Sequence, residues 1–422
     1  MDPGSFEGRG SPQVGVDEFL ALAELWGYGE ETRDAIRTAV EGEPDAGPML
    51  TRYRNPRPSR VDALESLAAD LFGVPFVLAV NSGTSALSAA YVGAGIGPGC
   101  EVIVPGYTFI ATAAAVVTSG ATPVIAEVDD SLTLDPADVE RKIGAQTKAI
   151  VPVHMNGASA AMDSLMDIAE RHDLLVIEDA AQACGGSFAG RRLGTIGDAG
   201  CFSLSSFKPT GAGEAGLVTT RDRHLYMRAQ SQHDTGALWR PDRFAVEREP
   251  GELFCGHNFR MSELEGAVNV VQLRKLDAQL ERRRRVREEI SARLRHYDAI
   301  HPRTLHDPAG EVATRLVMFA RSPQLASAIT ADLRDQGLPA WSRAGTGRRD
   351  WHIYAYWDHV LDEATRAECP RTLDLLERAI FMELGQWWTP GDCERAADAM
   401  NRVLGAHCRD LGRPAGWYGQ RR

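Results

Sequence analysis

The chain has 422 residues, of which 44% are hydrophobic and 25% are charged. This composition is typical of a soluble globular protein, and the length indicates one very large domain or two domains. The formal net charge of −12 argues against nucleic acid as the main partner, because phosphate groups bind to basic surfaces. No stretch approaches the about 20 apolar residues of a membrane helix, and the N-terminus lacks the apolar core of a signal peptide. We therefore expect a cytoplasmic protein that binds neither nucleic acid nor membrane.

Seven cysteines are scattered along the chain, and no pair has the close spacing of a zinc or redox motif. An odd number without such spacing indicates free, mostly buried thiols in a reducing compartment. We therefore expect neither a disulfide framework nor a metal site. The cysteines are Cys100, Cys184, Cys201, Cys255, Cys369, Cys393 and Cys408.

The first 45 residues are predicted to form an N-terminal extension. Its beginning, up to residue 13, is rich in Gly, Ser and Pro and is expected to be disordered. Apolar residues at helical spacing then predict helix over 15–42. After an irregular stretch rich in Pro and Arg, the same spacing predicts a further helix at about 60–73.

Short apolar runs alternate with helical stretches from residue 77 onwards. The runs are rich in β-branched residues and are bounded by Gly, Pro or Asp, which is typical of strands buried on both faces. They lie at 77–83, 101–106, 122–128, 149–154 and 174–181, and crossover helices are predicted at 84–94, 109–119, 135–142 and 159–172. Repeated strand–helix–strand units predict an α/β fold whose mostly parallel sheet has helices on both faces.

The rest of the chain is predicted to complete this sheet and then to form a smaller domain. Two more strands are predicted at 201–206 and 216–220, and a long helix from near Met261, with Ser262 as a possible cap, to about 294. A C-terminal α+β domain follows, with a strand near 314–320 and helices near 323–336, 370–379 and 390–405. We place the large domain at 46–275 and the small domain at 276–422.

The long helix contains an arginine run, ERRRRVREE, at 281–289. One interpretation is a patch for nucleic acid or targeting. The other, which the neighbouring Glu288 and Glu289 favour, is the solvated face of a long helix.

The ends of the predicted strands carry the residues with chemical potential, since ligands bind there in sheets of this kind. The run NSGTSAL turns from strand to helix at Gly83, and Thr84 and Ser85 could cap that helix while its free N–H groups hold a phosphate. Simple capping is the alternative at this turn. Asp179 stands at the end of LLVIED, in the last of these five runs, with Gln182 three residues on, and could bind a ribose, a metal or a ring nitrogen.

Lys208 lies in a Ser- and Gly-rich loop between Phe207 and Pro209, with Ser203 five residues earlier. Neighbours without charge allow the amine to be desolvated, which lowers its pKa and makes it nucleophilic. An ordinary exposed lysine is the alternative. Pyridoxal phosphate (PLP) requires an anion cradle, an aromatic partner for its ring, a carboxylate for its pyridine nitrogen and an amine for its aldehyde. The chain offers these groups in that order: the phosphate-type turn, Phe109 at a strand end, Asp179 and Lys208.

Residues 60–275 resemble the DegT/DnrJ/EryC1/StrS family of sugar and cyclitol aminotransferases. The resemblance lies in NSGTSAL (81–87), PGYTFIATA (105–113), VPVH (151–154), IEDAAQA (177–183), the Lys208 loop (197–216) and GHNFRMSELEGA (256–267). It implies PLP fold type I, which has a large domain with a seven-stranded sheet and a small C-terminal domain. It also implies a homodimer whose two active sites lie at the subunit interface.

The resemblance also assigns roles to individual residues. It implies that Lys208 forms the Schiff base and that Asp179 pairs with the pyridine nitrogen. Gln182 would lie near the phenolic oxygen of the cofactor and Phe109 would stack on its ring. The expected phosphate ligands are Gly83, Thr84 and Ser203, together with Asn258 from the neighbouring subunit, with Arg260 close by.

The expected reaction is transamination from L-glutamate or L-glutamine to a keto-sugar, a keto-cyclitol or a related carbonyl compound, in sugar, aminocyclitol or antibiotic biosynthesis. A lysine at position 208 favours it, because proton transfer requires an amine there. PLP-dependent elimination, decarboxylation or oxidation is the first alternative, and a catalytically idle binding protein the second. A dinucleotide-dependent dehydrogenase is disfavoured, since no GxGxxG follows the early strands. The segment 341–357 does not match the family's usual substrate-binding segment, so the identity of the amino acceptor stays open.

Overall fold

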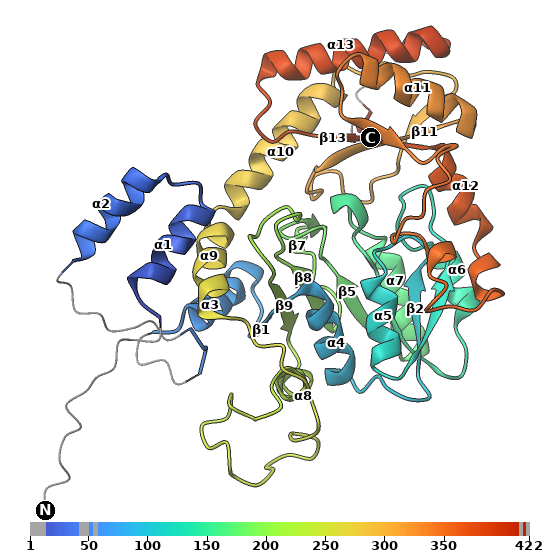
Figure 1. Cartoon of the computed structure of the whole chain (residues 1–422). Helices are drawn as coiled ribbons and strands as arrows, with labels where there is room; N and C mark the ends of the chain where they lie inside the picture. The colour runs from blue at the N-terminus through green and yellow to red at the C-terminus, as the bar shows by residue number, and fades with distance from the viewer. Residues whose placement is uncertain (1–13, 42–49, 54–57, 413–416, 419–422) are drawn as a thin grey trace, which may run out of the picture.

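The computed structural model describes residues 14–41, 50–53, 58–412 and 417–418, and a seven-stranded sheet forms its centre (Figure 1). The strand order is β1–β9–β8–β5–β4–β2–β3. The strands are parallel except β9, which runs antiparallel to both of its neighbours. They are β1 (Phe76–Val80), β2 (Glu101–Pro105), β3 (Thr122–Ala126), β4 (Thr147–Ile150), β5 (Leu175–Asp179), β8 (Ala199–Ser203) and β9 (Gly216–Thr220).

Helices cover both faces of this sheet, which confirms the predicted α/β fold class with a mostly parallel sheet. One buried cluster lies between the sheet and α4 (Gly83–Gly93), α5 (Ala111–Thr118) and α8 (Arg223–His233). A second cluster lies between the other face and α3 (Arg60–Phe72), α6 (Pro136–Lys142), α7 (Met162–His172) and α9 (Glu263–Arg274). Because both faces are buried, the strands consist of continuous apolar runs.

A second sheet of four antiparallel strands, in the order β10–β11–β13–β12, forms in the C-terminal part. Its strands are β10 (Ile300–Pro302), β11 (Arg315–Ala320), β12 (Ala340–Ser342) and β13 (Ala379–Glu383). Packed with them are α10 (Leu276–Ser291), α11 (Pro323–Asp335), α12 (Pro370–Arg378) and α13 (Pro390–His407). A third buried cluster, from Val286 to Trp417, belongs to this part. The first two clusters also include residues beyond 275, such as Trp357 in the first and Leu276 in the second, and the division at residues 275 and 276 stays a prediction.

Several elements differ from the sequence-based prediction. The predicted long helix is two helices, α9 and α10, which meet at Lys275, and Ser262 caps the first as expected. The predicted helical stretch 15–42 is also two helices, α1 (Val16–Leu25) and α2 (Glu30–Val40). Helix α8 and the hairpin of β6 (Ser187–Phe188) and β7 (Arg191–Arg192) were not predicted, nor were three short 3₁₀ turns at Met155–Gly157, Tyr354–Tyr356 and Thr365–Ala367. The prediction of disorder over residues 1–13 lies outside the described residues.

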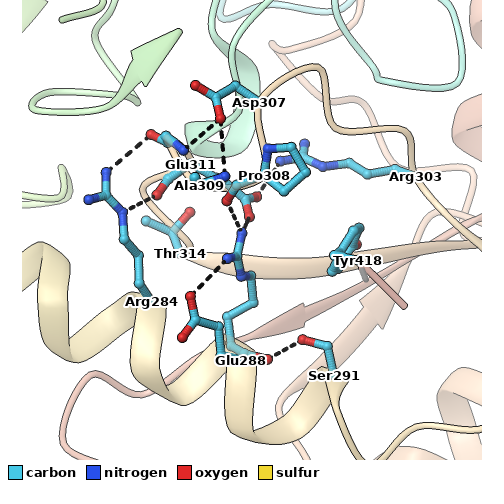
Figure 2. A network of polar contacts seen from close by, with 12 residues as sticks. Arg284, Glu288, Ser291, Arg303, Asp307, Pro308, Ala309, Glu311, Thr314 and Tyr418 are labelled. Carbon is cyan, nitrogen blue, oxygen red and sulfur yellow. Dashed lines mark hydrogen bonds and ion pairs between the residues drawn. The ribbon is translucent and has the colours of Figure 1, made fainter. Parts of the chain in front are cut away.

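The arginine run on α10 is a solvated face only in part: Arg285 is exposed and pairs with Glu289, as the favoured interpretation expects, whereas other arginines of the run are partly or fully buried. Arg287 is only 4% exposed, donates to the Pro308 carbonyl and pairs with Glu311 at 2.8 Å. Arg284 donates to the backbone carbonyl of Glu311 at 2.8 Å, and Arg303 pairs with the side-chain carboxylate of Glu311 at 2.8 Å (Figure 2). Because buried guanidinium groups need acceptors, these bonds join α10 to the 303–311 loop. The run is therefore largely structural.

The seven cysteines are free, as predicted, and Cys255 is the exposed one. Within the described ranges, no group of His, Cys, Asp and Glu side chains is arranged to hold a metal ion. In the same part of the chain, none of the helices is both long and apolar enough to cross a membrane.

Candidate active site

The turn after β1 brings Gly83 against Ser203 at the end of β8. A Cβ atom built on Gly83 would lie 2.7 Å from the Ser203 Cβ, so this approach requires glycine. The N-cap of α4 is Ser82, whose Oγ accepts from the Ser85 N–H at 3.1 Å. The prediction that Thr84 and Ser85 cap the helix was therefore wrong, because the cap lies one residue before the first helical residue. Thr84 is exposed in the first turn, where backbone N–H groups are free to bind an anion.

Asp179 ends β5 and is buried at the edge of the sheet. Thr112 Oγ1, from α5, donates to one carboxylate oxygen at 2.8 Å, and the Ala181 N–H donates to the other at 3.1 Å. Thr112 is in turn hydrogen-bonded to Thr108 at 2.7 Å. These bonds hold a carboxylate in one orientation, which suits it to pair with a cationic ring nitrogen.

Lys208 faces a cavity of about 480 Å³ between the two parts of the chain. Burial lowers the pKa of its amine, the charges of Asp179 and Glu214 oppose this shift, and the charge of Arg315 adds to it. A lowered pKa increases the share of neutral amine, which is the form that attacks an aldehyde or accepts a proton. The other residues that line this cavity are Tyr107, Met155, Gln182, Phe207, Pro209, Arg283, Thr314, Arg315, Trp341, Asp350, His352, Glu383 and Leu384.

Gln182 and Phe109 differ in their relation to this cavity. Gln182 lines the cavity, and its Oε1 accepts from the Asn156 N–H at 3.0 Å. Phe109 is 43% exposed, and its ring lies 5.3 Å from the ring of His352, which lines the cavity. Phe109 is thus next to the cavity without lining it, and its stacking role stays a prediction.

Asn258 is exposed and does not line the cavity that contains Lys208. Its Oδ1 accepts from the Arg260 N–H at 3.3 Å, and the Arg260 guanidinium pairs with Asp234 at 2.6 Å. In the single chain, the Asn258 side chain is therefore accessible to a neighbouring subunit. Its predicted role across a subunit interface is not tested by the single chain.

Sequence reasoning missed several residues of the cavity wall. Arg283 was read only as part of the arginine run, and Arg315 as part of an apolar strand. The unmatched segment 341–357 contributes Trp341, Asp350 and His352. Burial raises the pKa of Asp350, but hydrogen bonds from His352 and the charges of His352 and Arg343 outweigh this effect and bring it to about 2. The mismatch with the family pattern was the one available signal for this part of the wall.

Comparison with known proteins agrees with this geometry. A sequence model of the DegT/DnrJ/EryC1/StrS aminotransferase family matches residues 54–401. The chain belongs to this family. GDP-perosamine synthase of Caulobacter vibrioides is 40% identical over 228 residues, 53% of this chain and 58% of that protein. The L-glutamine:2-deoxy-scyllo-inosose aminotransferase of Micromonospora echinospora is 42% identical over 220 residues, 51% of this chain and 52% of that protein.

Solved structures give the same assignment of the fold. The crystal structure of 3-amino-5-hydroxybenzoic acid synthase superimposes with a TM-score of 0.70 at 30% identity, covering 82% of this chain and 91% of that one. The matches to curated relatives span about half of their length, 58% and 52% in the two cases above. Membership of an aminotransferase family implies a PLP-type cofactor.

Proposed function

We propose that this protein is a PLP-dependent aminotransferase with its cofactor attached to Lys208. The observation that supports the proposal is that Lys208 lines the cavity as a partly buried amine, and that Asp179, at the end of β5, is near enough for its charge to act on the pKa of this amine. Asp179 is buried and fixed by two hydrogen bonds. An amine and an oriented carboxylate are the two groups that PLP chemistry requires of a protein.

The remaining groups fit the other parts of the cofactor. The close contact of Gly83 with Ser203, together with the first turn of α4, which contains Thr84, suits a phosphate. Gln182 would lie near the phenolic oxygen and Phe109 over the ring. When bound, PLP supplies an aldehyde that carries the amino group and a ring that accepts electrons.

The protein's own contribution is positioning and proton transfer. Asp179, as an acceptor for a ring N–H, keeps the ring nitrogen protonated. The Lys208 Nζ atom would take the proton from the α-carbon of the donor and deliver it to the former aldehyde carbon of the cofactor, which thereby retains the amino group. Its lowered pKa favours this exchange, because burial increases the share of the neutral amine that accepts a proton.

The substrates follow from the family and from the relatives. One similar protein is named for an L-glutamine donor and a scyllo-inosose acceptor, and another for GDP-perosamine. We infer L-glutamine or L-glutamate as the donor and a keto-cyclitol or keto-sugar as the acceptor, in sugar or aminocyclitol biosynthesis. The site is proposed to work in a cytoplasmic homodimer.

The donor half-reaction tests the proposed activity. Holoenzyme mixed with L-glutamine or L-glutamate, without acceptor, should lose the visible absorption of its cofactor and release one oxoacid per site. Release of carbon dioxide or ammonia in place of the oxoacid would indicate decarboxylation or elimination. An unchanged spectrum with both donors would indicate an idle binding protein.

The proposed homodimer predicts that two inactive variants restore activity when they are mixed. In a hybrid of Lys208→Ala and Asn258→Ala chains, one site would combine intact Lys208 with intact Asn258 from the other chain. Asn258→Ala alone should be severely impaired, because a buried phosphate loses a donor. We expect turnover to reappear after dissociation and mixing. If hybrids confirmed by native mass spectrometry remain inactive, Asn258 does not act across the interface.

A further inference from the structure

One buried residue behind the wall of the cavity is hydrogen-bonded to three residues that line it. Asn156 is 1% exposed and does not itself line the cavity. Its N–H donates to Gln182 Oε1 at 3.0 Å. Its side chain accepts from Arg315 Nη1 at 2.6 Å and donates to the Tyr107 hydroxyl at 3.5 Å. Asn156 therefore joins parts of the wall that lie far apart in the chain.

The direction of the Asn156 N–H depends on an unusual backbone conformation. Asn156 is the middle residue of the 3₁₀ turn Met155–Gly157, and its φ of 55° and ψ of 29° lie in the left-handed region. Asparagine enters this region more readily than most residues, whereas a β-branched residue is an outlier there. Arg303 donates to the Met155 carbonyl at 3.2 Å and to the Asn156 carbonyl at 3.4 Å, and it is held in turn by Glu311 (Figure 2). These bonds fix the turn in one conformation.

The same contacts decide which end of the Gln182 amide faces the cavity. A backbone N–H can only donate, so the end of the amide that meets the Asn156 N–H is the oxygen. Within the described ranges, the Gln182 Nε2 group has no hydrogen-bond partner, and Gln182 lines the cavity that contains Lys208. The cavity is thus offered an N–H donor, which is the group that a negatively charged oxygen requires.

We propose that Asn156 is a positioning residue of the active site, whose left-handed backbone turns Gln182 so that the amide NH2 group donates to the phenolic oxygen of the cofactor. This inference rests on the proposed PLP-dependent function and extends it to a residue that touches neither cofactor nor substrate. Gln182 is the contacting group, and Asn156 acts through it. Without the left-handed conformation, the Gln182 amide is free to rotate and the phenolic oxygen loses its donor.

The pH titration of the visible band of the holoenzyme reports this contact without turnover. A donor to the phenolic oxygen stabilises its negative charge and weakens the cofactor's hold on the proton that governs the band. Gln182→Leu has no donor, so the pKa of the transition should rise by about one pH unit or more, as expected for the loss of a charge-assisted hydrogen bond. The charged groups around the cofactor site, which this variant leaves in place, are Asp179, Arg283, Arg315, Asp350, His352 and Glu383.

Two substitutions at Asn156 separate the backbone conformation from the side chain. Asn156→Gly and Asn156→Val both lose the bonds to Arg315 and Tyr107, but glycine adopts a positive φ freely and valine does not. We expect the Gly variant to titrate close to the wild type and the Val variant about one pH unit higher. In the Gln182→Leu background, Asn156→Val should add no further rise, because the same contact is already lost. Additive rises, or equal pKa values in the Gly and Val variants, would overturn the proposal.

Asp173→Val is the matched control for backbone strain. Asp173 follows α7 with a φ of 52°, is exposed, and lies before β5, at the opposite end of this strand from Asp179. The control should lose thermal stability without a change in the titration of the visible band. A rise in its pKa equal to that of Asn156→Val would attribute the effect to strain in general and contradict the positioning role.

A substitution of Gln182 decides the question where Asn156→Val does not fold. The carboxylate of Gln182→Glu can accept from the Asn156 N–H but has no donor for the phenolic oxygen. Its pKa should rise at least as far as that of Gln182→Leu. An unchanged pKa would mean that the amide oxygen, and not the NH2 group, faces the cofactor, which refutes the proposal.

The wild type separates this test from the proposed function. A protein that takes up PLP without a visible band refutes the attachment to Lys208, and the positioning role falls with it. A wild type that releases the oxoacid in the donor half-reaction, but titrates at the same pH as Asn156→Val, refutes only the positioning role.

Discussion

Lys208→Ala should abolish the covalent attachment of the cofactor and the turnover of the enzyme. The purified variant should lack the visible absorption of the wild type, and added PLP should dialyse away more readily. The loss of proton transfer alone should lower the rate by about 10²–10⁴-fold. Absorption spectra of the purified proteins, together with the rate of oxoacid release from L-glutamine, measure both effects.

A lysine elsewhere in the chain provides the control for this variant. Lys148 follows the first residue of β4 and is exposed. Lys148→Ala should keep the wild-type spectrum and rate. If Lys208→Ala retains both the visible band and turnover, the attachment site has been assigned wrongly.

Asp179→Asn should bind the cofactor and catalyse poorly. The amide oxygen can still accept from the Ala181 N–H, and its NH2 group can donate to Thr112 Oγ1 once that hydroxyl donates to Thr108, so the fold and the cavity should persist. A neutral group, however, does not favour a protonated ring nitrogen as a carboxylate does. By comparison with other electrostatic contacts in active sites, we expect the rate to fall by about 10²-fold or more.

The measurement for Asp179→Asn is the single-turnover rate with L-glutamine at saturating cofactor. Asp163→Asn, which changes an exposed carboxylate on α7, should leave that rate unchanged. A near-normal rate in Asp179→Asn would mean that another group holds the ring proton. Loss of cofactor binding without a loss of intrinsic rate would assign Asp179 a structural role.

The central sheet was predictable because its strands are buried on both faces and therefore consist of continuous apolar runs. Helix α8 was not predicted because its buried face includes Ser231, Gln232 and His233, which weaken the apolar periodicity. The break between α9 and α10 at Lys275 was missed for a related reason, since neither Gly nor Pro marks it.

Some residues of the candidate site could likewise be predicted from the sequence, and others could not. Asp179 and Lys208 were found because each follows an apolar run that indicates its place at the edge of the sheet. Arg283, Arg315 and His352 come from three distant segments, and only the packing of the C-terminal part against the sheet brings them to one cavity. No local pattern indicates such convergence, so the wall of the substrate pocket required the structure.

Borohydride reduction followed by peptide mass mapping tests the central claim most directly. The chain has four lysines, which are Lys142, Lys148, Lys208 and Lys275. Of these, Lys142 pairs with Glu368, Lys148 and Lys275 are exposed, and Lys208 lines the cavity. We predict that reduction of the PLP-loaded protein fixes one pyridoxyl group per chain, on the peptide that contains Lys208. A pyridoxyl group on any of the other three lysines, or none after reduction of a protein with a visible band, would contradict the account.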